Sequence, residues 1–186
     1  MQWLLAVGAG VVLLATIGFL GETDTEPTWS VTRKIDPISG QTIAYASSPN
    51  SKPVRKREFP YGGIQMAIGF ACDTDSEWGY LTFTETPNLI YDEIKDGYSL
   101  SLSRVRWDNV FYNRVELLQW RGEKALRFVN KARAIGDMMR YNTMLVELDW
   151  YGLGKVYFEA TLAGSTAAIS QARTICRPHI RRNQAR

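Results

Sequence analysis

The sequence is poor in the side chains that carry most metal and nucleophilic chemistry. It contains one His and two Cys in 186 residues. A structural zinc site needs four Cys or His ligands, so a single chain of this composition cannot build one. The lone His179 lies in an arginine-rich tail, which argues against a Ser-His-Asp triad. We therefore expect neither a metal nor a cofactor.

The sequence also lacks the features of disordered, fibrous or multidomain proteins. Hydrophobic residues make up 45% of the chain and charged residues 22%, a balance too apolar for disorder. Gly and Pro follow no repeat. A chain of 186 residues can close one hydrophobic core of ordinary size, so one folded domain is expected.

Residues 1–21 contain no charged side chain, and a polar linker, residues 22–28, follows with three acids. At about 1.5 Å rise per residue, a helix over this run spans the roughly 30 Å hydrocarbon core of a bilayer. A cleaved signal peptide normally has a basic start and an A-x-A-like cleavage site, and this run offers only its terminal amine and a weak site. We therefore favour an uncleaved anchor in the inner membrane over a cleaved signal peptide, and both over a buried core helix. Either export signal places the rest of the chain in the periplasm.

The two cysteines, Cys72 and Cys176, each end an apolar segment. In an oxidising compartment, one disulfide between them is the simplest interpretation. Closing a loop of about 100 residues stabilises a fold by up to ~4.7 kcal/mol in the chain-entropy model. Two buried thiols are the alternative, while a catalytic Cys is disfavoured because no CxxC motif or neighbouring base is present to activate it.

Alternation of polar and apolar residues predicts eight β-strands. They cover residues 29–35, 41–47, 64–72, 78–85, 98–107, 110–120, 143–151 and 155–162. In the fifth strand, Tyr98, Leu100 and Leu102 face one way and Ser99, Ser101 and Ser103 the other, as in a half-buried antiparallel strand. Residues 47–63, with three Pro and four basic side chains, predict a mobile loop.

Two segments follow a helical period instead. Residues 122–140 place Ala125, Leu126, Phe128 and Val129 on an apolar stripe, which predicts an amphipathic helix. A second helix is expected from Ser165, as its N-cap, to Cys176. The predicted fold is mainly β with two helices: an antiparallel β-sandwich over residues 29–176, closed by one disulfide and preceded by an N-terminal hydrophobic helix.

The order of these features resembles the VasI/TagO-like family, small bacterial envelope proteins associated with type VI secretion. The resemblance rests on Trp29 opening the domain, on Cys72 after an apolar strand, on Arg106-Trp107-Asp108 ending a strand, on the expected helix around Ala125, Phe128 and Val129, and on the closing segment FEATLAGSTAAISQARTIC, residues 158–176. The long loop 47–63, an Arg in place of an aromatic residue at position 104 and the arginine-rich end depart from the family pattern. The resemblance implies an exported, non-enzymatic accessory protein with one disulfide.

Arg104, Arg106 and Asp108 are the candidate binding residues, together with Trp107. On an alternating strand the first three share one face, opposite Trp107, so an arginine–carboxylate pair is sterically natural. Two interpretations stay open: an ion pair on the exterior of the sheet, or an arginine patch that faces a ligand.

The basic tail, residues 177–186, is a second candidate surface. Three of the 19 acids lie in the linker, so the chain after it carries 22 basic against 16 acidic side chains. Four of the positive charges are Arg177, Arg181, Arg182 and Arg186. They would contact anionic lipid headgroups, at ~1 kcal/mol per residue, or form a solvated tail. Nucleic acid is not an expected partner outside the cytoplasm.

Three functions remain in competition. The favoured one is an exported, membrane-tethered, non-enzymatic module of the bacterial envelope that binds another envelope protein, with a secretion-system accessory role as its narrower form. The second is a phage- or mobile-element-encoded inhibitor or superinfection-exclusion factor that uses the loop 47–63. The third is a small hydrolase using Asp92, Glu93 and Asp96, which would need two acids roughly 5 to 10 Å apart across a sugar.

Overall fold

The computed structural model of the protein describes residues 28–55 and 62–177, which contain ten strands and two helices. The strands are β1 (Ser30–Ile35), β2 (Thr42–Ser47), β3 (Met66–Cys72), β4 (Glu77–Phe83), β5 (Glu93–Lys95), β6 (Tyr98–Trp107), β7 (Val110–Trp120), β8 (Ala125–Phe128), β9 (Thr143–Trp150) and β10 (Gly154–Thr161). The helices are α1 (Lys131–Arg140) and α2 (Ser165–Cys176). The prediction of a mainly β protein with two helices is confirmed.

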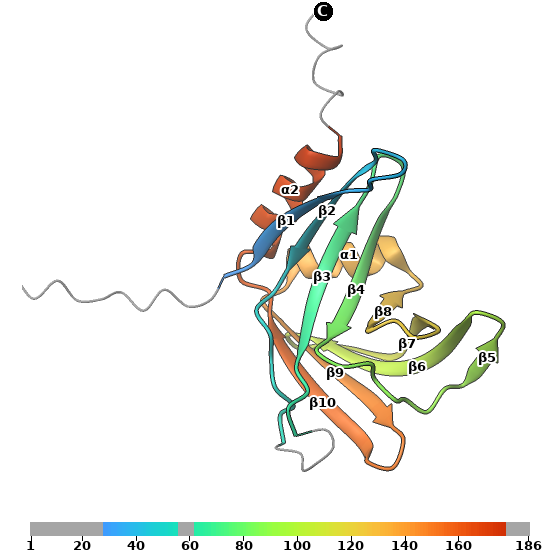
Figure 1. Ribbon diagram of the computed structural model, residues 1–186. Helices are drawn as coiled ribbons and strands as arrows, with labels where there is room; N and C mark the ends of the chain where they lie inside the picture. The colour runs from blue at the N-terminus through green and yellow to red at the C-terminus, as the bar shows by residue number, and fades with distance from the viewer. Residues whose placement is uncertain (1–27, 56–61, 178–186) are drawn as a thin grey trace, which may run out of the picture.

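All ten strands belong to one antiparallel sheet. Its order is β1-β2-β3-β4-β8-β7-β6-β9-β10, and β5 pairs with β6. The sheet bends so that β1 to β4 and the β9–β10 hairpin run in different directions, while β5, β6 and β7 extend away from the helices (Figure 1). The strands predicted to form two sheets therefore form a single curved sheet with a sandwich-like arrangement.

Residues 51–55 close this sheet at one end. They form β-bridges to Met66 of β3 and to Phe158 of β10, two strands that are far apart in the sheet order. This part of the predicted mobile loop 47–63 is therefore hydrogen-bonded into the sheet. Residues 56–61 lie outside the described residues.

The prediction of a helix over residues 122–140 is wrong in its first part, where residues 125–128 form strand β8. Leu126 and Phe128 are both buried, and β8 pairs with β4 on one side and β7 on the other. Two positions apart in a strand, the two side chains face the same way, whereas in a helix they would point about 200° apart. The helix begins only after Asn130, whose side chain accepts a hydrogen bond from the backbone N–H of Arg133.

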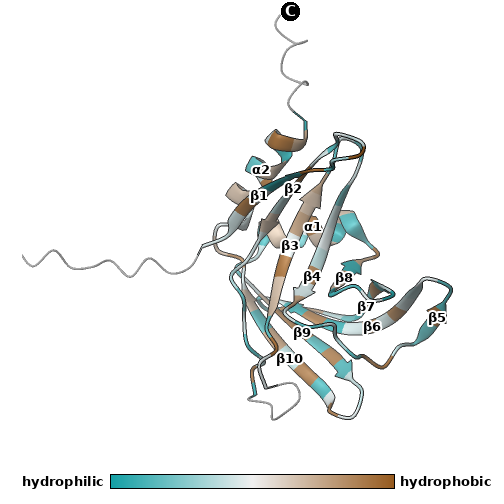
Figure 2. Ribbon diagram, viewed as in Figure 1, coloured by the Kyte–Doolittle hydropathy of each residue, from teal (hydrophilic) through white to brown (hydrophobic). Residues whose placement is uncertain are grey.

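The core lies on the inner, concave side of the sheet, and the two helices cover it there. Trp107 and Trp150 are 2% and 1% exposed. Hydrophobic and hydrophilic residues alternate along β10, and along β9 after its apolar start at residues 144–146 (Figure 2). In β6 the predicted alternation is present, but the buried face carries Ser101 and Ser103, because Val105 and Trp107 continue that face into the core.

A disulfide joins Cys72 at the end of β3 to Cys176 at the end of α2, with 6.1 Å between their Cα atoms. It fastens the last helix to the sheet and confirms the predicted pairing. The start of α2 differs from the prediction: its N-cap is Gly164, with a left-handed φ of +89°, and Ser165 is already inside the helix. The Ser165 hydroxyl instead donates to the carbonyl of Met138 in α1, at 2.6 Å.

Neither helix within residues 28–55 and 62–177 is long and apolar enough to cross a membrane. The predicted anchor, residues 1–21, lies outside the described residues, as do nearly all of the linker 22–28 and residues 178–186 of the tail.

Candidate functional site

The four predicted binding residues do not form one site. Arg104 and Arg106 project from the outer face of β6, Trp107 is buried on the inner face, and Asp108 follows the last residue of the strand. The alternation therefore separates Trp107 from the arginines as predicted. Asp108 does not follow this alternation because the chain turns at that residue.

Arg104 pairs with Glu147, the residue directly opposite it on β9. The guanidinium donates to both carboxylate oxygens, with Nε 2.8 Å from Oε1. Lys155 places its Nζ 2.9 Å from the same carboxylate, whose side chain is only 10% exposed. Burial opposes ionisation of Glu147, but the hydrogen bonds from Arg104, Lys155 and Tyr157 outweigh it and lower the pKa from 4.5 to about 2.

A shallow pocket of about 170 Å³ lies beside this pair on the outer face. It is lined by Arg104, Arg106, Phe111, Leu145, Glu147 and Tyr157. Glu147 neutralises Arg104, so for this arginine the interpretation as an ion pair on the exterior of the sheet holds. The acid of the pair is Glu147 rather than Asp108. Arg106 is exposed and lines the pocket.

Asp108 holds the start of β9. Its φ of +47° lies in the left-handed region, which Asp tolerates better than most residues. The carboxylate accepts hydrogen bonds from the backbone N–H groups of Asn142, at 3.1 Å, and Thr143, at 2.8 Å. These bonds lower the pKa of Asp108. They fix the connection between α1 and β9, so the role of Asp108 is structural.

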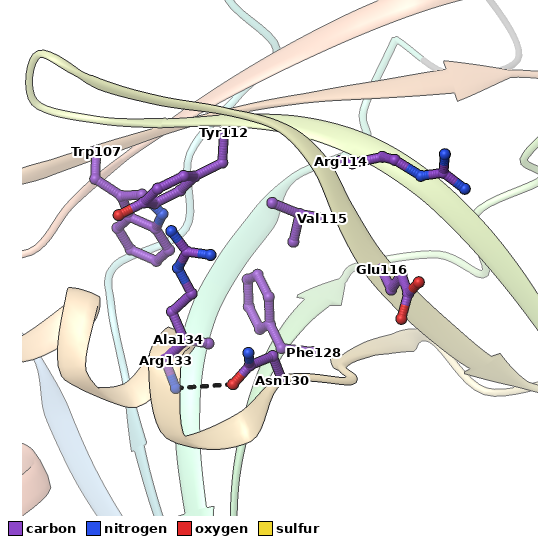
Figure 3. Close-up of a pocket in the computed structure, with 9 residues that line it drawn as sticks. All are labelled: Trp107, Tyr112, Arg114, Val115, Glu116, Phe128, Asn130, Arg133 and Ala134. Atoms are coloured by element: carbon purple, nitrogen blue, oxygen red, sulfur yellow. Dashed lines mark hydrogen bonds between the residues drawn. The ribbon is translucent and has the colours of Figure 1, made fainter.

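A second pocket, of about 180 Å³, opens between β7 and the start of α1 (Figure 3). Its lining is Trp107, Tyr112, Arg114, Val115, Glu116, Phe128, Asn130, Arg133 and Ala134. The buried rings of Trp107 and Phe128, with centroids 6.3 Å apart, form its apolar base. We call this the β7–α1 pocket.

A β-bulge shapes the β7 wall of this pocket. Ser103 pairs with Val115, but Val105, two residues later on β6, pairs with Tyr112, three residues earlier on β7. In a regular strand, side chains three positions apart face opposite sides of the sheet. The extra residue lets Tyr112 and Val115 both face the pocket, a redirection typical of bulges.

The α1 wall supplies the polar groups. The Arg133 guanidinium lies 3.8 Å from the centre of the Tyr112 ring, a cation–π distance. A hydrogen bond with the Tyr112 hydroxyl raises the pKa of Arg133 above its ordinary value. In Figure 3 the Arg133 guanidinium lies next to the rings of Tyr112 and Trp107, and the side-chain amide nitrogen of Asn130 is directed toward the Phe128 ring.

The charge in the β7–α1 pocket is positive. The first turn of α1 contains no acidic residue, so the positive end of the helix dipole adds to the charge of Arg133. Glu116 lines the rim, but its carboxylate points away from Arg133, and so does the guanidinium of Arg114 (Figure 3). Among the described residues, no salt bridge involves Arg133, and Asp137, one turn along α1, attracts it at longer range.

The size and chemistry of the β7–α1 pocket suit binding better than catalysis. Small-molecule sites usually measure about 300–1,000 Å³, so a space of about 180 Å³ accommodates one side chain rather than a metabolite. The lining contains no His, Cys, Ser, Thr or Lys, and its one carboxylate, Glu116, points away from Tyr112 and Arg133 (Figure 3).

Two of the three acids of the hydrolase hypothesis, Asp92 and Glu93, have other partners. The Asp92 carboxylate accepts a hydrogen bond from the backbone N–H of Leu102, at 2.6 Å, and Glu93 pairs with Lys95 at 2.8 Å. Of the basic tail, only Arg177 is described. It forms an ion pair with Glu77 at 3.4 Å, while Arg181, Arg182 and Arg186 lie outside the described residues.

Sequence reasoning found Trp107 but not its neighbours Tyr112 and Arg133. Arg133 fell within the helix predicted over residues 122–140, and no pattern of residue types in β7 marks the bulge that turns Tyr112 inward. An arginine three positions after a helix-capping Asn was the one available signal.

Comparison of the chain with protein-family models, with curated proteins and with solved structures found no match.

Proposed function

We propose that this protein is an exported, membrane-tethered, non-enzymatic module of the bacterial envelope, which binds another envelope protein through the β7–α1 pocket. The observation that carries the proposal is the pocket itself: an aromatic base, a stacked arginine and room for one side chain. Pockets filled by a single anchoring side chain are typical of the centres of protein–protein interfaces.

Two further features support the compartment and the tether. A disulfide between Cys72 and Cys176 persists in oxidising compartments such as the periplasm and is rare in the cytosol. The uncharged run 1–21 is long enough for a membrane anchor. The narrower role, an accessory protein of type VI secretion, rests on the resemblance of short motifs alone.

Site-specific photo-crosslinking in native membranes tests the proposal. A photoreactive residue replaces Glu116, at the rim of the pocket, and in a matched control replaces Glu159, an exposed position on β10. We expect one discrete crosslinked product with another envelope protein from the Glu116 position and none from the control. Recovery of only the uncrosslinked monomer from both positions would refute the proposed interface.

A further inference from the structure

We propose that the β7–α1 pocket recognises the C-terminal residue of its partner, binding the terminal carboxylate at Arg133 and an apolar side chain on Trp107 and Phe128. The inference deepens the proposed function and rests on it, because it names the chemistry of the group that the partner presents.

The first step is the charge of the bound group. The two polar groups directed into the pocket are hydrogen-bond donors, the guanidinium of Arg133 and the side-chain amide nitrogen of Asn130. The Asn130 oxygen already accepts the backbone N–H of Arg133, at 3.2 Å, which leaves the nitrogen end to donate. A ligand that complements these donors carries an acceptor, and a carboxylate matches a guanidinium best.

The second step is the apolar group. Trp107 and Phe128 are 2% and 3% exposed, and Val115 and Ala134 complete an apolar wall around them. Because those two rings are already buried, the apolar surface that is open to water comes mainly from the half-buried Tyr112 and Val115, and a bound carboxylate alone would leave it in contact with water. An aromatic or aliphatic side chain placed there removes apolar area from water and raises the strength of the neighbouring ion pair.

The third step is the distance between the two groups. Both must fit in about 180 Å³, so the carboxylate and the apolar side chain lie within one residue. A C-terminal residue carries both on the same Cα atom. In an internal acidic segment the nearest apolar side chain belongs to the next residue, about 3.8 Å along the chain and directed to the other side of an extended strand.

The stacking of Arg133 on Tyr112 makes the site ready for this ligand. The aromatic ring holds the guanidinium at the mouth of the pocket, so less rotamer entropy is lost when a carboxylate binds. A Lys at this position would keep the charge but lose the planar stack.

N-acetyl-phenylalanine is the probe, titrated into the full-length chain in detergent micelles and followed by NMR at the Trp107 indole and the arginine Nε–H signals. We expect saturable binding with a dissociation constant of roughly 1 mM, the range for a ligand of this size. N-acetyl-phenylalaninamide lacks the carboxylate and N-acetyl-glycine lacks the ring, so each should bind about tenfold more weakly or worse.

Three variants separate the role of Arg133 from general damage. Arg133→Gln should weaken binding of the probe about tenfold, whereas Arg121→Gln, an exposed arginine in the turn after β7, should leave it unchanged. Val115→Phe fills the pocket from β7 without altering Arg133, and should abolish binding even where Arg133→Gln fails to fold.

Equal binding of the acid and the amide, or no shift at Trp107 at saturating probe, would overturn the inference. The outcomes also separate it from the proposed function. If the Glu116 position crosslinks to a partner but the acid and the amide bind equally, the proposed interface is supported and recognition of a terminal carboxylate is refuted. If the probe binds as expected but no partner is crosslinked, recognition of a terminal carboxylate by the pocket is supported and the proposed interface is refuted.

Discussion

The guanidinium of Arg133 lies 3.8 Å from the ring centre of Tyr112, so that one cation–π contact joins α1 to β7 across the mouth of the pocket. The contact depends on two local features. The cap at Asn130 starts the helix three residues before Arg133, and the bulge in β7 turns Tyr112 to the inner face.

Substitutions of Tyr112 should therefore lower partner binding only when they remove its aromatic ring. Tyr112→Phe keeps the ring and loses the hydroxyl, so crosslinking from the Glu116 position should stay within about twofold of wild type. Tyr112→Leu removes the ring that orients Arg133 and should lower the crosslinking yield about tenfold. Equal yields from both variants would show that the stack does not serve binding.

Gly69 in β3 should not tolerate a side chain. A Cβ atom at this position would lie 2.4 Å from Cζ of Tyr80, whose ring is 8% exposed and whose hydroxyl is bonded to Ser47 at 2.8 Å. Gly69→Ala should lower the free energy of unfolding by about 1–3 kcal/mol, as overpacking does.

Gly136 in α1 supplies the matched control for that substitution. A Cβ there meets nothing within 4 Å, so Gly136→Ala should raise the free energy of unfolding by about 0.5–1 kcal/mol through helix propensity. Urea unfolding of both variants checks the pair. A neutral Gly69→Ala would contradict the close packing of Tyr80 on β3, and a destabilised Gly136→Ala would contradict the open space beside Gly136 in α1.

The Glu147 carboxylate should make stability depend on pH in acid. Its pKa falls from 4.5 to about 2 on folding, so the ionised form is favoured in the native state. The stabilisation is complete above about pH 4.5 and is lost as the pH falls through 2. Its full size is roughly 3 kcal/mol, from 1.36 kcal/mol for each unit of pKa change.

Glu147→Gln should remove this contribution and also leave Arg104 and Lys155 without their shared acid. Urea unfolding between pH 2 and pH 7 should show the variant less stable than wild type at neutral pH, with the two curves converging toward pH 2. Glu159→Gln, an exposed position on β10, is the control. Parallel curves for wild type and Glu147→Gln would disprove the assignment.

Removal of the disulfide should cost stability without changing the fold. The bond closes a loop of 104 residues, for which the chain-entropy model gives up to about 4.7 kcal/mol. A Cys72→Ala, Cys176→Ala variant should unfold at lower temperature than wild type. Reductant should lower the midpoint of wild type toward that of the variant, and a variant insensitive to reductant with an unchanged midpoint would show that the bond contributes nothing.

The elements that sequence predicted well are those whose signal is local. Seven of the predicted strands overlap with β1 to β4, β6, β7 and β9, and the eighth with β10. In β6 and β10 the period-two alternation coincides with burial on one face, whereas β3 is a short apolar run that is buried throughout. The Cys72–Cys176 bond was predictable because two cysteines allow only one pairing, and residues 1–21 predicted an oxidising compartment. Strand β8 was missed because its four residues also fit the start of the helical stripe that follows, and only its place between β4 and β7 decides between them.

The candidate site was less predictable because its geometry depends on residues distant in sequence. Arg104 has an acid four positions ahead, Asp108, yet pairs with Glu147, 43 residues away, because antiparallel pairing of β6 with β9 sets the two opposite each other. Trp107 was recognised as a neighbour of the arginines, but its pocket partners come from β7, β8 and α1. A bulge adds one residue to a strand and leaves no mark in the pattern of residue types.

The claim that the domain works outside the cytoplasm is tested most directly by the redox state of Cys72 and Cys176 in living cells. Thiols are blocked by alkylation at the moment of lysis, and the full-length chain from the cell envelope is then weighed by mass spectrometry without reduction. We predict an unmodified pair, which becomes alkylated only after reduction, because the bond forms in an oxidising compartment. Two alkylated thiols in the unreduced protein would contradict export of the folded domain.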